Sequence, residues 1–274
     1  MNTFGRKFRI TIWGESHGES IGVNIDGCPP GIELSETDLL EDLARRKSGK
    51  RGTTPRTEGD KPHIISGVYN GYTTGAPISI MFLNENTRSS DYSQFAAIPR
   101  PGHADFTSSK KYKGYTDPRG GGHLSGRVTL GLVAAGVIAK KRISPVVIQA
   151  ILIEAGGSTD ISTAVEKAME SEDSIGGIIS CMATNMPVGL GEPFFDSVEA
   201  VLAHGLFSIP AIKGVEFGAG FEAAKMSGSE HNDPIVSADG KTATNNAGGI
   251  NGGITNGNDL LFKVAVKPTS SIGK

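Results

Sequence analysis

The chain has 274 residues, of which 37% are hydrophobic, and its formal net charge is −2. This length and apolar fraction suit a globular protein with a packed core, arranged as one large domain or two small ones. The charge balance gives no electrostatic reason to expect nucleic acid or an anionic membrane as a partner, and no run of about 18 apolar residues is present to span a membrane.

The chain begins with an expected β-hairpin and a capped helix. Residues 8–13 alternate in polarity and are β-branched, and residues 21–25 supply the second strand. Ser35, followed by Asp38 at the capping-box spacing, predicts the start of a helix. The helix is expected to end at the basic residues 45–47, because positive charge suits the negative end of the helix dipole.

Two long stretches without periodicity interrupt this half of the chain. Residues 47–61 and 84–122 are rich in charged, polar or glycine residues, and we expect both to be loops. Strands are expected between them near 62–69 and 76–83. Irregular stretches of this kind inside a compact chain are usually functional or mobile, so a site is expected near them.

The clearest helix is expected at residues 125–141, whose centre is apolar nearly all round and should be buried. The expected elements that follow are strand 145–153, helix 160–171, strand 176–183, helix 196–206, strand 212–217 and strand 260–266. This order indicates a protein of the α+β or α/β class.

Glycines flank a histidine directly after the first expected strand. Residues 14–18 place His17 in a turn, where it is either a site residue or an ordinary histidine whose polar atoms are satisfied. Ser16 makes the segment match the Gly-x-Ser-x-Gly pattern of a nucleophile elbow, but a strand follows instead of the required helix. The segment therefore offers an imidazole and not a serine nucleophile.

The loop after the first helix is basic. Arg45, Arg46, Arg51 and Arg56 could bind phosphate or carboxylate groups bidentately. The alternative is a solvated basic loop, which is the commoner case in general. The loop is therefore one candidate anion site.

A second histidine lies between an arginine and an aspartate. His103 has Arg100 and Asp105 close in sequence, so it could act as a general acid near a phosphate. The alternative is a turn capped by Asp105.

Glycine clusters mark further candidate anion sites. Residues 119–127 contain a glycine loop that runs into the buried helix, and backbone N–H groups in such a place can bind an anion. The loop lacks the lysine of a P-loop and the preceding strand of a dinucleotide-binding motif. Residues 247–253 and the hydroxyl-rich residues 267–271 are similar, weaker signals. Together these segments indicate an enzyme for a small, multiply anionic substrate, and no residue cluster indicates a metal.

The order of these segments resembles that of the chorismate synthase family. Residues 14–18, 25–27 and 29–31 are similar to its first signature. The next blocks are similar, in the same order, at residues 45–56, 100–105, 119–127, 189–193, 214–216, 247–253 and 267–272. The resemblance covers essentially the whole chain, and many ordered blocks are far more specific than any one of them.

This resemblance implies an α+β fold, a sandwich of β-α-β layers, in a single domain over residues 1–274. It implies a homotetramer that uses reduced FMN, with NADPH only as a possible reductant. The implied reaction is the last step of the shikimate pathway, an anti 1,4-elimination of phosphate and a ring hydrogen from 5-enolpyruvylshikimate 3-phosphate that gives chorismate. The resemblance also implies that the flavin is not consumed and lends an electron transiently so that phosphate can leave.

Roles for individual residues follow from the resemblance. His17 would balance the proton or charge of the reduced flavin, and His103 would protonate the departing phosphate. The phosphate and carboxylates of the substrate would be bound by Arg46, Arg51 and Arg127, of which the first two also match positions that the family associates with NADPH. The flavin would be lined by His123, Leu124, Ser125, Ala211, Gly252, Lys267, Pro268, Thr269, Ser270 and Ser271.

The chain departs from the family pattern at two places. Many members carry arginine where this chain has His123, which weakens a phosphate contact there. Family chains also continue into an Arg-His-Asp-Pro block that contributes to the flavin site. We therefore expect the natural chain to continue beyond Lys274, and a protein that ends there to be weakly active at best.

Two other functions fit the residues. One is a catalytically inactive relative that only binds phosphorylated ligands, and the other is a flavin oxidoreductase that consumes NADPH in proportion to product. Cys28 and Cys181 are expected to be buried small apolar side chains in a cytoplasmic protein. Ordinary packing or surface roles are expected for His63, His204, His231, Met182 and Met186.

Overall fold

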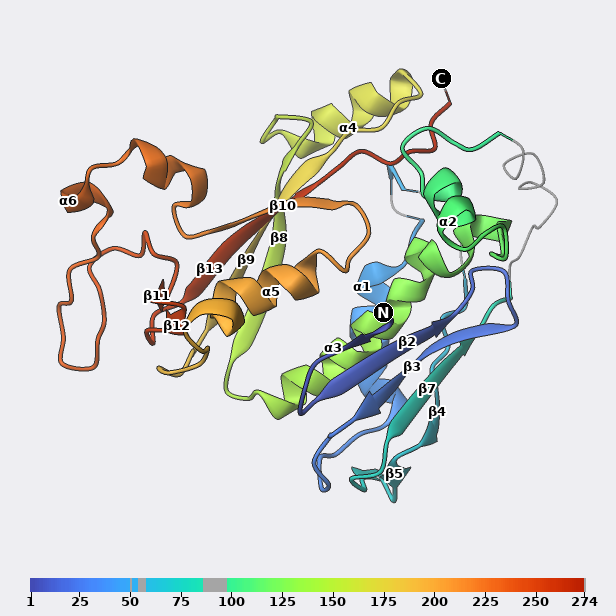
Figure 1. Cartoon of the computed structure of the whole chain (residues 1–274), viewed down its shortest axis with the longest axis horizontal. Coiled ribbons are helices and arrows are strands. Elements are labelled where there is room, and N and C mark those ends of the chain that lie inside the picture. Colours follow the sequence, from blue (N-terminus) through green and yellow to red (C-terminus); the bar gives the residue numbers. More distant parts are fainter. Residues whose placement is uncertain (50, 54–57, 86–97, 274) are drawn as a thin grey trace. The chain divides into compact units, whose positions relative to one another are not determined.

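The computed structural model describes residues 1–49, 51–53, 58–85 and 98–273. Arg56 of the predicted basic loop therefore lies outside the described residues. The chain divides into two compact units, Met1–Ile143 and Ser144–Lys274, each with its own sheet and core (Figure 1). That the whole chain acts as one domain stays a prediction.

An antiparallel five-stranded sheet is the framework of the first unit. Its strands lie in the order β1 (Thr3–Phe4), β2 (Arg9–Gly14), β3 (Ser20–Asp26), β7 (Ile78–Leu83) and β4 (His63–Ser66). The predicted hairpin of β2 and β3 is confirmed, with Gly14 opposite Ile21. Buried residues alternate along β7, so one face of that strand points into the core. A small hairpin of β5 (Val68–Tyr69) and β6 (Tyr72–Thr73) is separate from this sheet.

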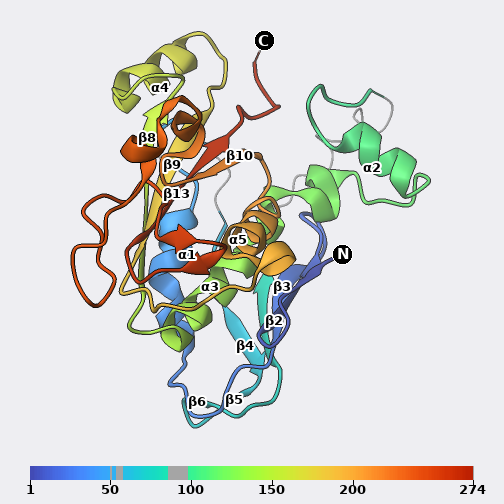
Figure 2. The same ribbon diagram turned by 60° about the vertical axis from the view of Figure 1, so that its left-hand side comes forward.

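Two helices cover one face of this sheet. α1 (Leu40–Arg46) and α3 (Leu130–Arg142) pack against each other, and α3 packs on β3 (Figure 2). Leu43 of α1 and Ile138 of α3 lie in the resulting core. α1 follows a 3-10 turn, η1 (Glu36–Leu39), which begins with the predicted capping box of Ser35 and Asp38.

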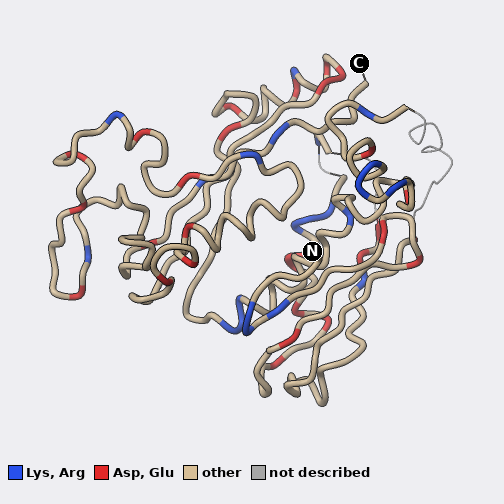
Figure 3. The backbone as a smooth tube through the Cα atoms, viewed as in Figure 1, with Lys and Arg blue, Asp and Glu red and all other residues tan. Residues whose placement is uncertain are grey.

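α3 is the core helix of the first unit. It follows the 3-10 turn η4 (Gly126–Thr129), and none of residues 130–139 is exposed, which confirms the predicted burial. By length and composition the run Arg119–Arg142 could also cross a membrane, but half of its most apolar window is buried inside the protein. The C-terminal end of α3 is basic (Figure 3) and forms an ion pair with η1, in which Lys141 Nζ lies 2.7 Å from Asp38 Oδ1.

The prediction of a loop over residues 84–122 is wrong in its described part. α2 (Asp105–Lys111) and the 3-10 turn η3 (Arg119–Leu124) lie there. No residue of α2 is buried, so the helix lacks the apolar period by which sequence reasoning finds helices. The strand expected at 62–69 is divided between β4 and β5, because Gly67 has a φ of 83°.

The second unit is built on an antiparallel four-stranded sheet. Its strands lie in the order β10 (Ile212–Phe217), β13 (Leu260–Val266), β9 (Gly177–Thr184) and β8 (Val147–Ala155). α4 (Ile161–Glu170) packs by β8 and α5 (Val198–Leu206) by β10, at the two edges of the sheet. Every element predicted for this half is present, and β10 and β13 have the predicted bounds.

Several short elements of the second unit were not predicted, because an element of so few residues is too short to show a hydrophobic periodicity. They are the hairpin of β11 (Ile250–Asn251) and β12 (Ile254–Thr255), helix α6 (Gly228–His231) and the 3-10 turns η5 (Phe194–Asp196) and η6 (Gly220–Lys225). Cys181 lies in the core of this unit and Cys28 in that of the first, as predicted. Burial raises the pKa of both thiols, which makes them poor nucleophiles.

Candidate active site

Three consecutive glycines form the centre of the candidate site in the first unit. Gly120, Gly121 and Gly122 have φ values of 58°, 81° and 55°, which residues with a side chain rarely adopt. A Cβ at Gly122 would lie 2.2 Å from the carbonyl oxygen of Asp117. The Gly122 carbonyl accepts a hydrogen bond from the Ser16 N–H at 3.1 Å, so the glycine loop is held against the turn that follows β2.

His17 lies against the first of these glycines. It is only 6% exposed, and a Cβ at Gly120 would lie 2.6 Å from its Cδ2 atom and 2.7 Å from its Nε2 atom. Only glycine therefore leaves room for the imidazole in this position. Hydrogen bonds from Arg119 hold the pKa of the Asp117 carboxyl below its ordinary value, and the charge of His17 adds to this effect. His17 thus has an ionised carboxylate in its surroundings.

His103 lies against the second glycine. A Cβ at Gly121 would lie 3.4 Å from its Cε1 atom and 3.5 Å from its Nε2 atom, which is ordinary van der Waals contact. Its Nδ1 atom lies 2.6 Å from Asp105 Oδ1. Asp105 also accepts hydrogen bonds from Arg100, at 2.9 Å from Nε and 3.0 Å from Nη2. One nitrogen of the predicted general acid is therefore held, and the other lies at the glycine loop.

The structure brings the two predicted catalytic histidines to one loop. Successive Cα atoms are about 3.8 Å apart, and a Cα–Cβ bond adds about 1.5 Å at each end. Together with the contacts above, this places Nε2 of His17 and Nε2 of His103 within roughly 13 Å of each other. His103 lines a hollow beside the loop, whereas His17 is buried and lines neither of the two hollows there.

Two hollows of about 490 Å³ each open beside this loop, and Gly121 and Leu124 line both. His103 lines one of them, whereas Trp13 and His123 line the other. Leu124 is 44% exposed and so presents an apolar side chain to a ligand. Concave sites with apolar walls and a few polar groups are typical of small-molecule binding.

His123 and Ser125, two predicted flavin residues, have structural partners in this unit. Nδ1 of His123 lies 2.7 Å from the carbonyl oxygen of Gly14, and its Nε2 atom lies 3.1 Å from Asn2 Oδ1. Because a carbonyl oxygen can only accept, Nδ1 carries a proton. Ser125 Oγ accepts a hydrogen bond from the Arg127 N–H at 3.3 Å and so caps η4. Flavin contacts by these two residues stay a prediction.

Arg127 is buried with an aspartate. Its side chain is 6% exposed, and it forms an ion pair with Asp60, whose side chain is 3% exposed. Its Nε atom donates to Asn84 Oδ1 at 3.1 Å, and its Nη2 atom donates to the Leu83 carbonyl at 3.4 Å. Most donors of the guanidinium group are therefore used within the protein.

Arg46 lies beside this ion pair. Burial lowers the pKa of its guanidinium group, while the charge of Asp60 raises it and that of Arg127 lowers it further. Arg46 Nη2 donates to the Gly126 carbonyl at 2.7 Å, just before Arg127 in the chain. Two of the predicted anion-binding arginines are thus brought together around one carboxylate, which leaves an excess of positive charge. Arg51, the third, lies in an exposed turn.

In the second unit, residues predicted to bind the flavin phosphate form one group. The backbone N–H of Lys267 donates to the Ala211 carbonyl at 2.9 Å, and Lys267 Nζ donates to Ser270 Oγ at 2.9 Å. Ala211 has a φ of 76°, a conformation that is rare for a residue with a Cβ and often marks a functional position. Ammonium and hydroxyl donors suit an anionic group, and phosphate binding by residues 267–271 stays a prediction.

Gly252 lies apart from that group. It belongs to the turn between β11 and β12, and a Cβ at nearby Gly249 would lie 3.1 Å from the Cα atom of Leu260, where β13 begins. Lys267 follows the other end of β13, and a strand of 7 residues spans roughly 20 Å. The second unit by itself therefore does not bring Gly252 to Lys267.

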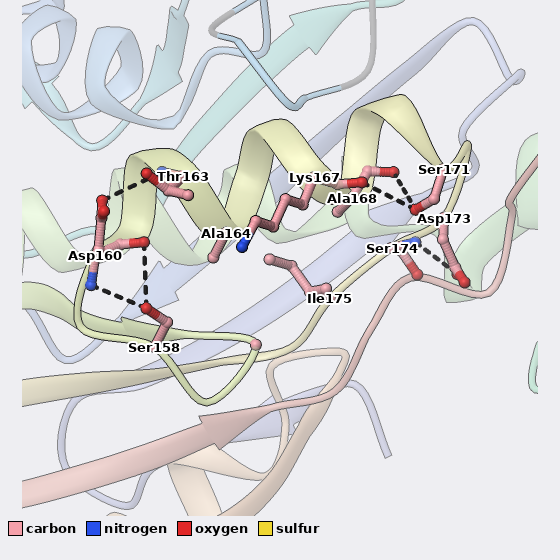
Figure 4. Close-up of a pocket in the computed structure, with 11 residues that line it drawn as sticks. Ser158, Asp160, Thr163, Ala164, Lys167, Ala168, Ser171, Asp173, Ser174 and Ile175 are labelled. Atoms are coloured by element: carbon pink, nitrogen blue, oxygen red, sulfur yellow. Dashed lines mark hydrogen bonds between the residues drawn. The ribbon is translucent and has the colours of Figure 1, made fainter.

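A hollow of about 550 Å³ lies along α4 (Figure 4). Lys167 and Asp160 line it, and none of the predicted site residues does. Ser174 at its rim donates from Oγ to the Thr269 carbonyl at 2.8 Å. The hollow therefore adjoins the predicted phosphate segment without containing any of its side chains.

Sequence reasoning missed the residues that hold the predicted ones. Asp60 and Asn84 bind Arg127 from 67 and 43 residues away, a separation at which no local pattern exists. Asp117 and Arg119 form an ion pair beside His17, with Nη2 and Oδ2 2.8 Å apart. Their closeness in sequence was a signal that could have been used, because a short Asp-x-Arg turn lets the two side chains meet.

Comparisons of the sequence and the fold with known proteins point to one family. The family model described as chorismate synthase matches residues 8–274. A chorismate synthase of Chitinophaga pinensis is 62% identical over 275 residues, covering 100% of this chain and 83% of that protein. One of Dehalococcoides mccartyi is 46% identical over 303 residues, covering 99% and 83%. A crystal structure of chorismate synthase aligns with a TM-score of 0.77 at 29% identity, covering 96% of this chain and 85% of that one, which confirms the predicted fold class.

Proposed function

Because the chain belongs to the chorismate synthase family, we propose that it converts 5-enolpyruvylshikimate 3-phosphate into chorismate by anti 1,4-elimination of phosphate and a ring hydrogen. The observation that supports this most is the meeting of His17 and His103 at consecutive glycines of one loop. An elimination that expels phosphate needs a proton donor for the leaving group and a second group that balances charge. The proposed enzyme is a lyase of aromatic amino-acid biosynthesis.

His103 is the proposed acid for the departing phosphate. Its Nδ1 atom is held by Asp105, so Nε2 is the atom that delivers the proton. His17 is proposed to balance proton or charge at the reduced flavin from its buried position against Gly120. The burial of His17 strengthens its electrostatic effect, because water screens it little.

Arg46 and Arg51 are proposed to bind the phosphate and carboxylates of the substrate, and Arg127 supports them from its ion pair with Asp60. A direct contact of Arg127 with substrate is part of the proposal. The first two arginines are ranked as substrate ligands ahead of NADPH ligands, since the elimination needs no net reduction.

The described residues fit reduced FMN. Leu124 and Ser125 offer apolar and hydroxyl contacts, and Lys267 and Ser270 offer donors for a phosphate. The further proposed ligands are His123, Ala211, Gly252, Pro268, Thr269 and Ser271. The chemistry that reduced FMN supplies when bound is transient electron donation that lets phosphate leave, without net consumption of the flavin. A cytoplasmic homotetramer and NADPH as an optional reductant complete the proposal.

The test is the affinity for reduced FMN, measured by fluorescence with and without the enolpyruvyl substrate, together with NADPH consumption per product. An enzyme of this kind should bind flavin more tightly with substrate present and should form product without stoichiometric NADPH use. Unchanged flavin affinity and no product would favour a ligand-binding relative. One NADPH consumed per product would favour an oxidoreductase.

We expect Arg51→Ala or Arg46→Ala to raise the substrate KM. Losing one charge-assisted hydrogen bond to an anion costs roughly 1.5–3 kcal/mol of binding free energy. Arg45→Ala is the matched control, since Arg45 is exposed and pairs with Asp42 at 3.6 Å. Steady-state kinetics of the three variants measure the effect, and three equal KM values would show that the basic loop is only a solvated surface.

Gly120→Ala is expected to lower turnover by about 100-fold, because a Cβ there would displace His17, and small misplacements of reacting groups have effects of that size. The left-handed backbone adds a stability loss of about 1–2 kcal/mol. Gly136→Ala is the control, since a Cβ at Gly136 meets nothing within 4 Å. Turnover and chemical unfolding of both variants measure these effects. Wild-type turnover in Gly120→Ala would mean that the position of His17 does not matter.

A further inference from the structure

Asp105 is the centre of a three-residue contact beside the glycine loop. Its carboxylate accepts from the backbone N–H of Arg100 at 3.1 Å and from the same residue's guanidinium group at 2.9 and 3.0 Å. Its Oδ1 atom lies 2.6 Å from Nδ1 of His103, and Arg100 Nη2 lies 3.2 Å from the same nitrogen. The side chains of Arg100 and Asp105 are 14% and 12% exposed, so solvent weakens these contacts little.

The ionisation state of Asp105 determines where the proton on His103 lies. Burial raises the pKa of the Asp105 carboxyl, but hydrogen bonds from Arg100 and the charge of His103 outweigh it, so the net pKa is below its ordinary value. An ionised carboxylate can only accept hydrogen bonds, and a guanidinium group can only donate them. Nδ1 of His103 lies 3.2 Å from Arg100 Nη2 but only 2.6 Å from Asp105 Oδ1, and Nη2 already donates to that oxygen. The closer contact, to an atom that can only accept, therefore places a proton on Nδ1.

This arrangement aims Nε2 at the glycine loop. Nε2 would lie 3.5 Å from a Cβ at Gly121, and both residues line the same hollow. A neutral imidazole free to exchange tautomers would hold its only proton on Nε2 part of the time, and a rotated ring would point Nε2 elsewhere. Carboxylates that fix the tautomer and orientation of a histidine are a recurring device in enzymes and metal sites.

We propose that Asp105 is a positioning residue for His103: it holds one proton on Nδ1, so that the second proton of the acid form lies on Nε2, the nitrogen at the glycine loop, and Arg100 holds Asp105 in place. The expected effect of Asp105 on kcat rests on the proposed function, whereas its effect on the tautomer of His103 does not. The competing role is purely local, since Asp105 is also the first residue of α2 and its carboxylate joins that helix to the preceding turn.

The experiment compares the full chain with Asp105→Asn, with ring-¹⁵N-labelled histidine and long-range NMR correlation that identifies the protonated nitrogen. The His103 signal is assigned by its loss in His103→Ala. We expect the Nδ1–H tautomer in the wild type and a mixed or Nε2–H tautomer in Asp105→Asn. In the assay with reduced FMN, kcat should fall about 100-fold with little change in KM. Asp26→Asn is the control, because Asp26 also pairs with an arginine, Arg9, on the strands β3 and β2.

Each outcome decides the question. The same tautomer in wild type and Asp105→Asn, or wild-type kcat in that variant, would overturn the proposal. If Asp105→Asn does not fold, Asp105→Glu keeps a carboxylate but displaces it, and it should keep the Nδ1–H tautomer with a reduced kcat; wild-type kcat there would count against positioning. If the wild type forms no chorismate, the proposed function fails, while the NMR measurement still tests Asp105 because it needs no substrate.

Discussion

Replacing His103 with alanine is expected to lower the turnover number for chorismate formation by about 10²–10⁴-fold, the range that a positioned proton donor contributes. Without an acid, phosphate must leave as a more highly charged anion. His103 sits at the surface of a hollow with a side chain 24% exposed, so the change should leave the core of the unit intact. Flavin affinity should therefore stay close to the wild-type value.

The measurement is kcat at saturating substrate with reduced FMN in excess. His63→Ala is the matched control, since His63 lies in β4 of the same unit and outside both hollows. It should leave kcat unchanged. An unchanged kcat in His103→Ala would remove this residue from the mechanism, and a loss of equal size in both variants would indicate a general effect on folding.

Arg127→Ala is expected to lower the free energy of unfolding by about 3–5 kcal/mol, which is the usual effect of removing one partner of a buried ion pair. The substitution would leave Asp60 as a buried, unpaired carboxylate and would also remove the donor that binds Asn84. The double variant Asp60→Ala/Arg127→Ala should recover part of this loss, because it leaves no unpaired charge.

Urea unfolding of the two single variants and the double variant gives the coupling free energy directly. This measurement also separates two roles for Arg127. A direct substrate ligand that contributes little to folding would raise KM in Arg127→Ala and leave the unfolding free energy at the wild-type value. That result would contradict the structural role inferred from the burial of the ion pair.

Local patterns predicted much of the fold, and the reasons are visible in particular elements. The apolar centre of α3 required burial on all sides, and β13 has strand-like composition over its full length. The capping box at Ser35 and Asp38 was correctly predicted because its partners lie within one helical turn. α2 was missed because it buries no residue, and the strand expected at 62–69 is divided because Gly67 has a positive φ, which the sequence pattern did not indicate.

Part of the candidate site was predicted from the family resemblance and not from local sequence patterns. Family resemblance identified His17 and His103, but only the folded chain places both against one glycine loop. The resemblance could not indicate that the donors of Arg127 are largely used by Asp60 and Asn84, since those partners come from distant loops. The resemblance also gave no reason to expect Gly252 and Lys267 to lie apart. Their separation follows from the length of β13, which lies between them.

The most direct test of the account is an anaerobic assay of the full chain with photoreduced FMN and 5-enolpyruvylshikimate 3-phosphate, followed by chorismate absorbance and the flavin spectrum together. The account predicts many chorismate molecules per flavin, no product with oxidised FMN or without flavin, and a flavin that is still reduced when substrate is exhausted. Product formed at the same rate without flavin, or flavin oxidised in proportion to product, would contradict it.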